Sequence, residues 1–565
     1  MGISPSGYSG VTPPRPSRRP EAGAADLCLA GGQVADVRAG VLVRAAVAIS
    51  GERISAVGPE AVLTTGARRV VDVSGRVIAP GYIEPHTHAV LANPVEFAGA
   101  LLRCGTTTAL VDALPLQVLV PPDRLPALLE RLAALPLALR WQIRLHPPAF
   151  PEEERFALEW LRDLWRLPSV AAVGEVTRWT DLYDGVPELA AKVAAARADG
   201  RRVEGHAPGA SYERLAVLAA RGFSSCHEAV TAQEVLDRLQ AGLHVMLRHS
   251  PIRPDLPRLA PAVTSDLWTS ERLMLTADGP TPAYIEDRGY MDHVLRTAIR
   301  NGIPPLVALR MATLNPAAYY GLADRGEVKP GARADLNVLP DATEPRPEVV
   351  IAGGQIVAER GALLRPLPAF DWADTLGPLR LPRVSRDVFA PDASLPACRL
   401  VNDVITEPTE MASADGWLQT ALVDRKGRWV TRCRLEGFAA RLGGLATTVN
   451  TALDLLVVGQ EPADMAAAAG RLADLGGGIV VVEEGREVFA FPLELGGIFS
   501  CRPWAAVVEA NRRLSALLRV RGYRFTDPIY SLMFLTFDSL PWVRLTSRGV
   551  WDVRSRRVMS PSLRL

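Results

Sequence analysis

Six side chains of the types that bind metal ions occur in five separated segments of this chain. They are His86, His88, Glu175, His206, His227 and Asp278. Imidazole nitrogens and carboxylate oxygens are the ligands that hold divalent zinc, iron or manganese in proteins. Two such ions can turn water into a nucleophile at neutral pH. The set therefore predicts a metal-dependent hydrolase.

The spacing of these residues fits the successive strands of a barrel. His86 and His88 follow an apolar run over 77–83, and residues i and i+2 of a strand point to the same side. His206 follows Glu175 by 31 residues, and His227 and Asp278 follow by a further 21 and 51. A (β/α)8 barrel of about 250 residues has about 31 residues per unit. We therefore expect the ligands at the C-terminal ends of the strands, where barrel active sites lie.

Apolar runs alternate with amphipathic stretches through the middle of the chain. The runs predict strands at 106–111, 139–145, 170–176, 202–206 and 273–277. The amphipathic stretches predict helices at 122–135, 152–167, 186–199, 211–220 and 232–241. Continuous apolar strands between helices are typical of a parallel sheet that is covered on both faces. The fold class is therefore predicted as α/β, with a (β/α)8 barrel over residues 77–322.

The segments outside the barrel predict further domains. Short strands and glycine-rich turns occur on both sides of it, so residues 26–76 and 323–365 are predicted to build one small β domain. Residues 366–385 are a proline-rich linker, and residues 386–565 are predicted to form a C-terminal α+β domain. In that domain a helix over 465–475 should stop at Gly476. Residues 1–25, rich in Pro, Ser, Gly and Arg, are predicted to be a flexible leader.

Composition excludes several classes of partner. The chain has 565 residues, of which 48% are hydrophobic and 22% charged, and its formal net charge is +1. That balance gives no reason to expect a nucleic-acid or membrane partner. No apolar run reaches the roughly 18 residues that a membrane span needs. The six cysteines are widely spaced, which favours a reducing, cytoplasmic location.

The chain resembles the amidohydrolase superfamily and, within it, the adenine deaminases. The motifs that carry the resemblance are Gly-Tyr-Ile-Glu-Pro-His-Thr-His at 81–88, Gly-Glu-Val at 174–176, Gly-His-Ala-Pro-Gly at 205–209 and Cys-His-Glu at 226–228. Gly-Glu-Val-Lys-Pro-Gly-Ala-Arg-Ala-Asp at 326–335 is similar to the superfamily's return into the small β domain. The last region is similar to the C-terminal domain that is peculiar to adenine deaminases.

The resemblance implies a dinuclear centre of manganese or iron, with zinc as an alternative. It implies that His86 and His88 hold one ion, that His206 and His227 hold the other, and that Glu175 bridges them. It further implies metal binding and proton transfer for Asp278, and substrate contact or ligand support for Glu228. Apart from the resemblance, Asp292 and His293 are predicted to line the barrel mouth and to bind substrate. The implied reaction is hydrolytic deamination of adenine to hypoxanthine and ammonia by metal-activated hydroxide, and a homo-oligomer is a further implication.

The chain departs from the family at three places. Ala-Val-Leu at 89–91 stands where the family has Ile-Glu-Ser, Asp278-Gly279 replaces Asp-Asp, and the segment 449–454 replaces a His-Asp-x-His-Asn stretch. Loss of polar groups around a bound base changes specificity. The substrate is therefore predicted to be adenine or a related aminated heterocycle. The alternatives are an amidohydrolase that opens a cyclic amide or other ring, and a non-catalytic barrel that binds a metabolite.

Overall fold

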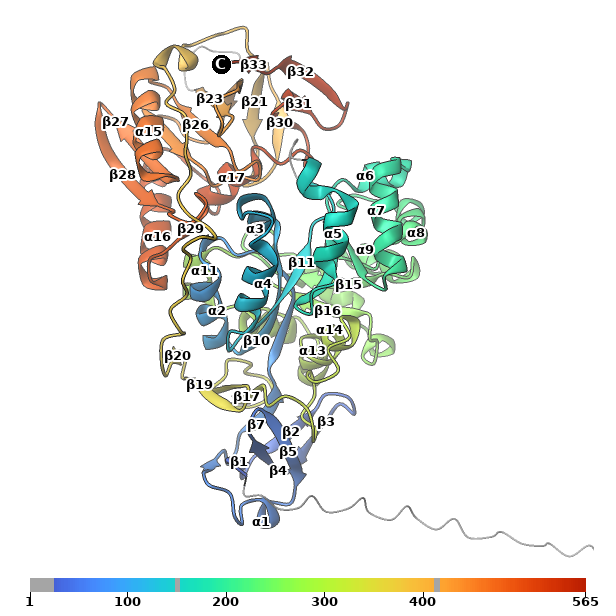
Figure 1. The fold of residues 1–565 in the computed structure, drawn as a ribbon. Helices are drawn as coiled ribbons and strands as arrows, with labels where there is room; N and C mark the ends of the chain where they lie inside the picture. Colours follow the sequence, from blue (N-terminus) through green and yellow to red (C-terminus); the bar gives the residue numbers. More distant parts are fainter. Residues whose placement is uncertain (1–24, 148–152, 411–416) are drawn as a thin grey trace, which may run out of the picture.

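The computed structural model describes residues 25–147, 153–410 and 417–565. A small strand-rich body lies at the bottom of Figure 1, the barrel lies above it, and a second body of helices and strands lies at the top. The predicted flexible leader falls outside the described residues except for its last residue. Among the described residues, no helix is both long and apolar enough to cross a membrane.

Two sheets form the small β domain, and both flanks of the barrel contribute to them. The first has the strand order β5-β4-β1-β6, and the second has the order β20-β19-β18-β17-β7-β2-β3. The N-terminal elements are β1 Leu27–Ala30, β2 Gln33–Asp36, β3 Val41–Arg44, β4 Ala46–Ser50, β5 Arg53–Gly58, α1 Glu60–Leu63, β6 Val70–Asp72 and β7 Val77–Pro80. The elements after the barrel are β17 Leu336–Leu339, β18 Val349–Ala352, β19 Gln355–Glu359 and β20 Ala362–Leu363. Antiparallel pairing of β7 with β17 joins the two flanks.

The apolar run that predicted a single strand over 77–83 contains parts of two strands. β7 ends at Pro80 in the small domain, and β8, Tyr82–Thr87, begins the barrel. Gly81 lies between them, where an added Cβ would stand 2.2 Å from Thr107 Oγ1. Only glycine fits this close approach, so the chain passes from one sheet to the other at Gly81.

Eight parallel strands make the barrel, in the spatial order in which they occur along the chain. They are β8, β10 Thr106–Asp112, β11 Ala138–Ile143, β12 Val170–Val176, β13 Arg202–Gly205, β14 Ser225–Cys226, β15 His244–Arg248 and β16 Leu273–Thr276. The α/β barrel prediction is confirmed, and the five predicted strands match to within two residues. β14 and β15 were not predicted individually.

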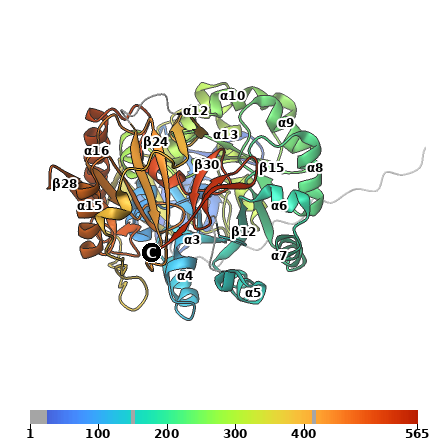
Figure 2. The ribbon, with the colours of Figure 1, turned by 90° about the horizontal axis from the view of Figure 1, so that it is seen from above.

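Helices surround the barrel (Figure 2). They are α2 Pro94–Arg103, α3 Leu114–Leu119, α4 Leu125–Ala133, α5 Leu158–Trp165, α6 Trp179–Asp184, α7 Pro187–Ala198, α8 Tyr212–Arg221, α9 Ala232–Gln240, α10 Leu256–Leu259, α11 Pro282–Arg288, α12 Met291–Arg300, α13 Pro305–Met311 and α14 Leu314–Tyr319. Of these helices, α3 lies at the barrel mouth (Figure 2). The helix predicted over 152–167 is a 3-10 turn, Glu153–Phe156, followed by α5.

A buried carboxylate connects the first and last strands of the barrel sheet. Glu84 of β8 accepts hydrogen bonds from Thr276 Oγ1 (2.5 Å) and from the backbone N–H groups of Ala277 (2.9 Å) and His86 (3.0 Å). Burial outweighs these bonds and raises the pKa of Glu84 to about 8. The two donors from Thr276 and Ala277 hold β8 and the end of β16 together directly beneath the strand ends.

The C-terminal domain contains a large mixed sheet in the order β22-β21-β24-β23-β26-β25-β27-β28, with β33 beside β24, and a three-stranded sheet β30-β31-β32. Its strands are β21 Ala397–Leu400, β22 Thr406–Pro408, β23 Leu418–Val423, β24 Trp429–Glu436, β25 Gly444–Thr447, β26 Leu455–Gly459, β27 Gly478–Glu483, β28 Arg486–Pro492, β30 Val543–Thr546, β31 Gly549–Asp552, β32 Arg557–Pro561 and β33 Leu563–Arg564. Its helices are α15 Pro462–Leu475, α16 Trp504–Val520 and α17 Pro528–Phe534. Gly476 ends α15 with a φ of 73°, as predicted.

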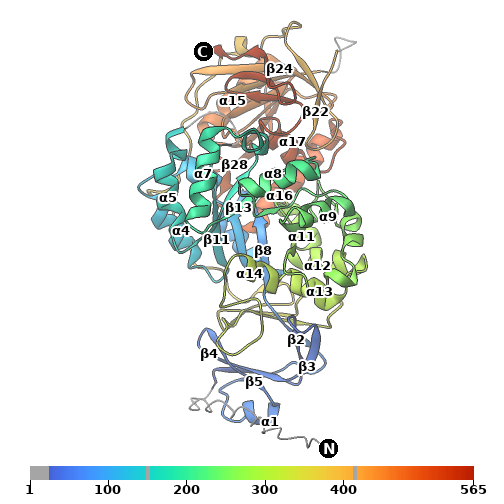
Figure 3. The same cartoon turned by 90° about the vertical axis from the view of Figure 1, so that its right-hand side faces the viewer.

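This domain sits over the C-terminal ends of the barrel strands, as the side view in Figure 3 shows. Its strand β29, Phe499–Ser500, pairs in parallel with β9, Leu91–Ala92, of the barrel. The Asn93 side chain caps α2 and donates through Nδ2 to Ser500 O at 2.8 Å. The strand pairing and this side-chain contact fix the C-terminal domain on the barrel mouth.

Candidate metal centre

All six predicted ligands lie together at the C-terminal ends of barrel strands. His86 is in β8, with His88 just beyond it, and Glu175 is in β12. The others follow the ends of their strands, His206 and His227 directly after β13 and β14 and Asp278 two residues after β16. His86 is completely buried, while the other five line a cavity beneath the C-terminal domain.

Four imidazoles form two pairs on either side of Glu175. The Nε2 atoms of His86 and His88 are 3.2 Å apart, and His206 Nδ1 is 3.3 Å from His227 Nε2. Glu175 Oε1 lies 2.5 Å from His206 Nδ1 and 3.2 Å from His227 Nε2. Its Oε2 lies 3.9 Å from His88 Nε2. The carboxylate therefore spans the space between the two pairs.

These donors are suited to binding divalent metal. Two imidazole nitrogens that face each other at about 3 Å repel through their lone pairs unless a proton or a cation lies between them. Asp278 Oδ1 lies close to both histidines of the pair His86 and His88, at 3.6 Å from His86 Nε2 and 3.5 Å from His88 Nε2. Glu175 forms one group of three possible ligands with His86 and His88, and another with His206 and His227. Within each group, one ligand atom from each residue lies within 4.8 Å of the other two. Imidazole and carboxylate are the ligand set of zinc, manganese and iron.

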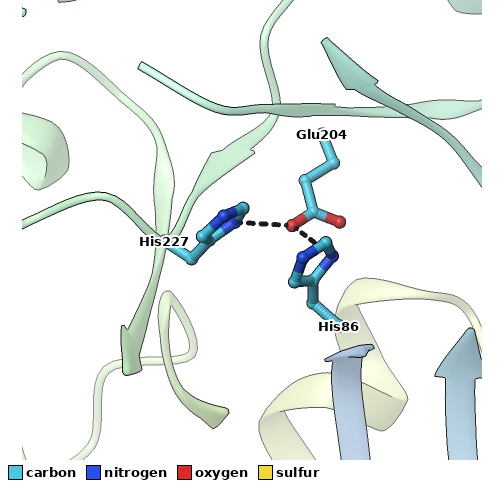
Figure 4. A group of neighbouring side chains, drawn as sticks. All are labelled: His86, Glu204 and His227. Atoms are coloured by element: carbon cyan, nitrogen blue, oxygen red, sulfur yellow. Dashed lines mark hydrogen bonds and ion pairs between the residues drawn. The ribbon is translucent and has the colours of Figure 1, made fainter. Parts of the chain in front are cut away.

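Glu204 and Gln142 lie beneath the four imidazoles, and neither was singled out by the sequence. Glu204 Oε1 is 3.1 Å from His86 Nδ1 and 3.0 Å from His227 Nδ1 (Figure 4). Gln142 Nε2 donates to Glu204 Oε2 at 2.7 Å. Burial opposes the charge of Glu204, but His86 and His227 lower its pKa to about 2. The ionised carboxylate therefore accepts from both rings, on the sides away from Glu175.

A second unpredicted pair, Asp112 and Arg144, supports His88 and Glu175. Asp112 Oδ2 is 3.2 Å from His88 Nδ1, and Arg144 Nη2 lies 2.7 Å from Asp112 Oδ2 and 2.6 Å from Glu175 Oε2. All of these groups except His88 are buried. Although burial opposes ionisation, Arg144 and His88 lower the pKa of Asp112, and Arg144 and His206 hold the pKa of Glu175 well below its usual value.

Two further arginines bind the carboxylates on the opposite side. Arg248 Nη1 donates to Glu228 Oε1 at 2.5 Å and to Asp278 Oδ2 at 3.0 Å. Arg253 Nη1 donates to Glu228 Oε2 at 3.2 Å. Burial alone would raise the pKa of Glu228, but Arg248, His206 and Arg253 hold it well below its usual value. Glu228 is therefore a fixed carboxylate at the cavity wall.

The position at a strand end is the sequence signal that these additional residues share. Asp112 ends β10, Arg144 follows β11, and Arg248 ends β15. When these three residues are added to the six predicted ligands and Glu228, every barrel strand contributes a charged or imidazole side chain to one site. Glu204 lies two residues before His206, in the same alternation that related His86 to His88.

Asp292 and His293, the predicted substrate-binding residues, lie in α12 and are absent from the lining of this cavity. Asp292 is buried and accepts from Tyr290 N at 2.7 Å at the start of its own helix. His293 Nε2 lies 3.2 Å from the Tyr284 hydroxyl. The two side chains therefore serve contacts of α11 and α12 in this structure.

Burial keeps the four remaining histidines neutral at pH 7. It lowers the pKa of His146 to about 3, of His244 and His293 to about 4, and of His249 in the same direction. In the unfolded chain each would titrate near 6.5. Protons then bind the unfolded chain preferentially below about pH 6.5, so stability is full above that pH and falls as the pH decreases.

We expect His146→Gln to weaken this acid sensitivity. His146 Nδ1 donates to Pro147 O at 3.0 Å and its Nε2 accepts from Arg178 N at 3.5 Å, so protonation would disrupt the second contact. The thermal midpoint of the metal-loaded variant should drop less between about pH 7 and pH 5 than that of the wild type. Equal drops in the two proteins would contradict the assignment of His146 as a buried neutral group.

The cavity has a volume of about 460 Å³ and is lined by residues of two domains. Polar groups of the metal centre form its floor. Apolar side chains of the C-terminal domain form most of its roof, among them Ile405, Val449, Ile498, Phe499, Met533, Phe534, Phe537 and Leu540. A few convergent polar groups in an apolar cavity of this size are typical of a small-molecule site.

Comparison with known proteins agrees with this architecture. The model of the amidohydrolase family matches residues 77–357, and the model of the adenine deaminase C-terminal domain matches residues 400–557. A relative from Halalkalibacterium halodurans is 36% identical over 511 residues, which cover 87% of each chain. A protein named adenine deaminase from Cereibacter sphaeroides is 33% identical and covers 94% of this chain and 96% of its own. The corresponding protein from Nitratidesulfovibrio vulgaris is 32% identical, with 94% and 95% covered. The chain belongs to the adenine deaminase family of the amidohydrolases.

Proposed function

We propose that this protein is a metal-dependent hydrolase that deaminates adenine or a related aminated heterocycle and releases ammonia. The observation that carries the proposal is the position of Glu175 between two histidine pairs on the floor of a cavity that the C-terminal domain roofs. Full-length relatives named adenine deaminase support the same class of reaction.

His86, His88 and Asp278 would hold one divalent ion, His206 and His227 the other, and Glu175 would bridge them. Bound there, the ions would activate water and polarise the substrate. We propose manganese or iron as the native ions, with zinc as an alternative. All six cysteines are free, which fits a reducing compartment such as the cytoplasm.

Asp278 is the residue that we assign to proton transfer. Burial would raise its pKa, but the contacts with His86 and Arg248 hold the pKa well below its usual value. An ionised carboxylate at this position can take a proton from water and return it to a ring nitrogen or to the departing amino group. Arg248 fixes the other oxygen, Oδ2, and so orients Oδ1 toward His86 and His88.

Glu228 would accept a hydrogen bond from an N–H group of the substrate. Two arginines hold it ionised at the wall, so it can accept but not donate. The apolar roof would exclude bulk water from the bound ring. These residues therefore provide an acceptor, a proton carrier and a dry enclosure around one heterocycle.

The departures from the family pattern gather around the same space. Ala89, Val90, Gly279, Val449, Asn450 and Thr451 all line the cavity. Apolar residues at several of these positions reduce the hydrogen bonds available to a polar base. Because such bonds discriminate strongly between substrates, the exact heterocycle depends on these positions.

Ammonia release from a panel of aminopurines and aminopterins tests the proposal. The protein would be loaded anaerobically with iron or manganese, and its metal content measured first. We expect turnover of adenine or of another aminated ring in the panel. If the metal-loaded protein is silent across the whole panel, deamination is refuted, and cyclic amides become the substrates to assay.

A further inference from the structure

Asp278 adopts a left-handed backbone conformation, with φ 59°. Residues with a side chain are uncommon in this region, although Asp enters it more readily than most, and surrounding contacts hold them there. On its upstream side the barrel supplies such contacts. Asp278 N donates to Thr276 Oγ1 at 3.0 Å, and Thr87 Oγ1 donates to Asp278 O at 2.5 Å.

On its downstream side the contacts come from the C-terminal domain. The Tyr530 hydroxyl donates to Gly279 O at 2.9 Å and accepts from Thr281 N at 3.0 Å. Thr281 Oγ1 donates to Asp527 Oδ2 at 2.9 Å. Tyr530 and Asp527 belong to α17 and its N-cap, about 250 residues away in sequence. The segment after Asp278 is thus fastened to another domain.

The helix that fastens this segment also forms part of the cavity roof. Met533 and Phe534 follow Tyr530 by three and four residues, which places them on the same face of α17. Both line the cavity, as Tyr530 does. The rings of Tyr530 and Phe534 are nearly parallel, with centroids 6.4 Å apart and an interplanar angle of 9°. One short helix therefore contacts both the substrate space and the backbone beside Asp278.

We propose that Tyr530 is a positioning residue through which the C-terminal domain sets the place of the Asp278 carboxylate. This inference rests on the proposed function, because it assumes that Asp278 transfers protons. A proton carrier must be held within a fraction of an ångström of its productive position, since a misplacement of about 1 Å can cost about 10²-fold in rate. Tyr530 uses its hydroxyl as both donor and acceptor to hold the backbone on either side of Pro280.

The test is Tyr530→Phe, which removes only the hydroxyl. We expect kcat to fall about 10- to 100-fold while KM stays within about threefold and the metal content is unchanged. Tyr82→Phe is the matched control. Tyr82 is also buried, is not part of the cavity lining, and donates through its hydroxyl to Pro345 O at 2.6 Å across a different domain boundary. Its kcat should remain that of the wild type.

A readout without substrate separates this proposal from the function on which it rests. In metal-free protein, amide hydrogen exchange over residues 277–282 should be faster in Tyr530→Phe than in wild type and unchanged in Tyr82→Phe. Unaltered exchange would overturn the proposal even if the enzyme deaminates adenine. A rise in KM at constant kcat would also overturn it, because Tyr530 would then act as a substrate contact. If exchange is faster in Tyr530→Phe but the wild-type protein deaminates no substrate, the proposed function is refuted. The role of Tyr530 in holding the backbone after Asp278 is then still supported.

Discussion

Replacing Asp278 by Asn is expected to lower kcat by about 10³-fold while the fold survives. Asn has nearly the shape of Asp but cannot carry a proton between water and the departing amine. Arg248 would keep its contact with Glu228, so the change leaves no buried guanidinium unpaired. The other five proposed metal ligands, which are four histidines and Glu175, are unchanged in this variant. Steady-state kinetics, metal analysis and the thermal midpoint of the same preparation measure the three consequences.

Asp292→Asn is the control for this experiment. Asp292 is also a fully buried carboxylate, but it accepts from Tyr290 N at the start of its own helix and does not line the cavity. We expect its kcat and KM to stay close to those of the wild type. Substantial turnover by the Asp278 variant would remove that residue from proton transfer. A large loss in the Asp292 variant alone would reinstate Asp292 as a substrate-binding residue.

Replacing Glu204 by Gln is expected to weaken both metal sites together. A single oxygen of Glu204 faces the Nδ1 atoms of His86 and His227, which belong to different histidine pairs. Carboxylates that orient metal-binding histidines contribute about 10- to 100-fold to metal affinity. The variant should therefore lose both ions over the same range of chelator concentration, as metal analysis after dialysis would show.

Asp112→Asn provides the comparison, because Asp112 faces only His88 Nδ1 among the four imidazoles. It should reduce the occupancy of one site more than the other. Loss of one ion alone from the Glu204 variant would show that its carboxylate does not serve both pairs. If the variant retains both ions at wild-type affinity, the Glu204 carboxylate stabilises the fold beneath the imidazole rings but does not contribute to metal binding.

The sequence predicted the barrel and brought six candidate ligands to one place, because both depend on local periodicity and on strand ends. The sequence did not predict which residues pair with the buried arginines. Arginine is usually exposed, and nothing local to Arg144 or Arg248 shows that each would pair with two carboxylates from other strands. The two-residue strand β14 is too short for any periodic pattern. One apolar run is split at Gly81 between a strand of the small domain and a strand of the barrel. The sequence does not show this split, because its cause is the close approach of Thr107 to Gly81 in the folded chain.

The placement of Asp292 and His293 shows a second limit. They follow Asp278 closely in sequence, and a helix there could face either the mouth or the flank of the barrel. Which face it turns inward is decided by the packing of Met291, Val294 and Leu295, all of them buried. Helical periodicity identifies that face but not the neighbour against which it packs.

The pairing of β7 with β17 has a consequence for synthesis of the chain on the ribosome. Val77–Pro80 emerges more than 250 residues before Leu336–Leu339, its neighbour in the sheet. Until then β7 has β2 on one side only, and its other edge is open. Unpaired strand edges invite association with other chains. We expect products truncated between the barrel and residue 336 to aggregate, and nascent chains to need chaperone protection until the second flank arrives.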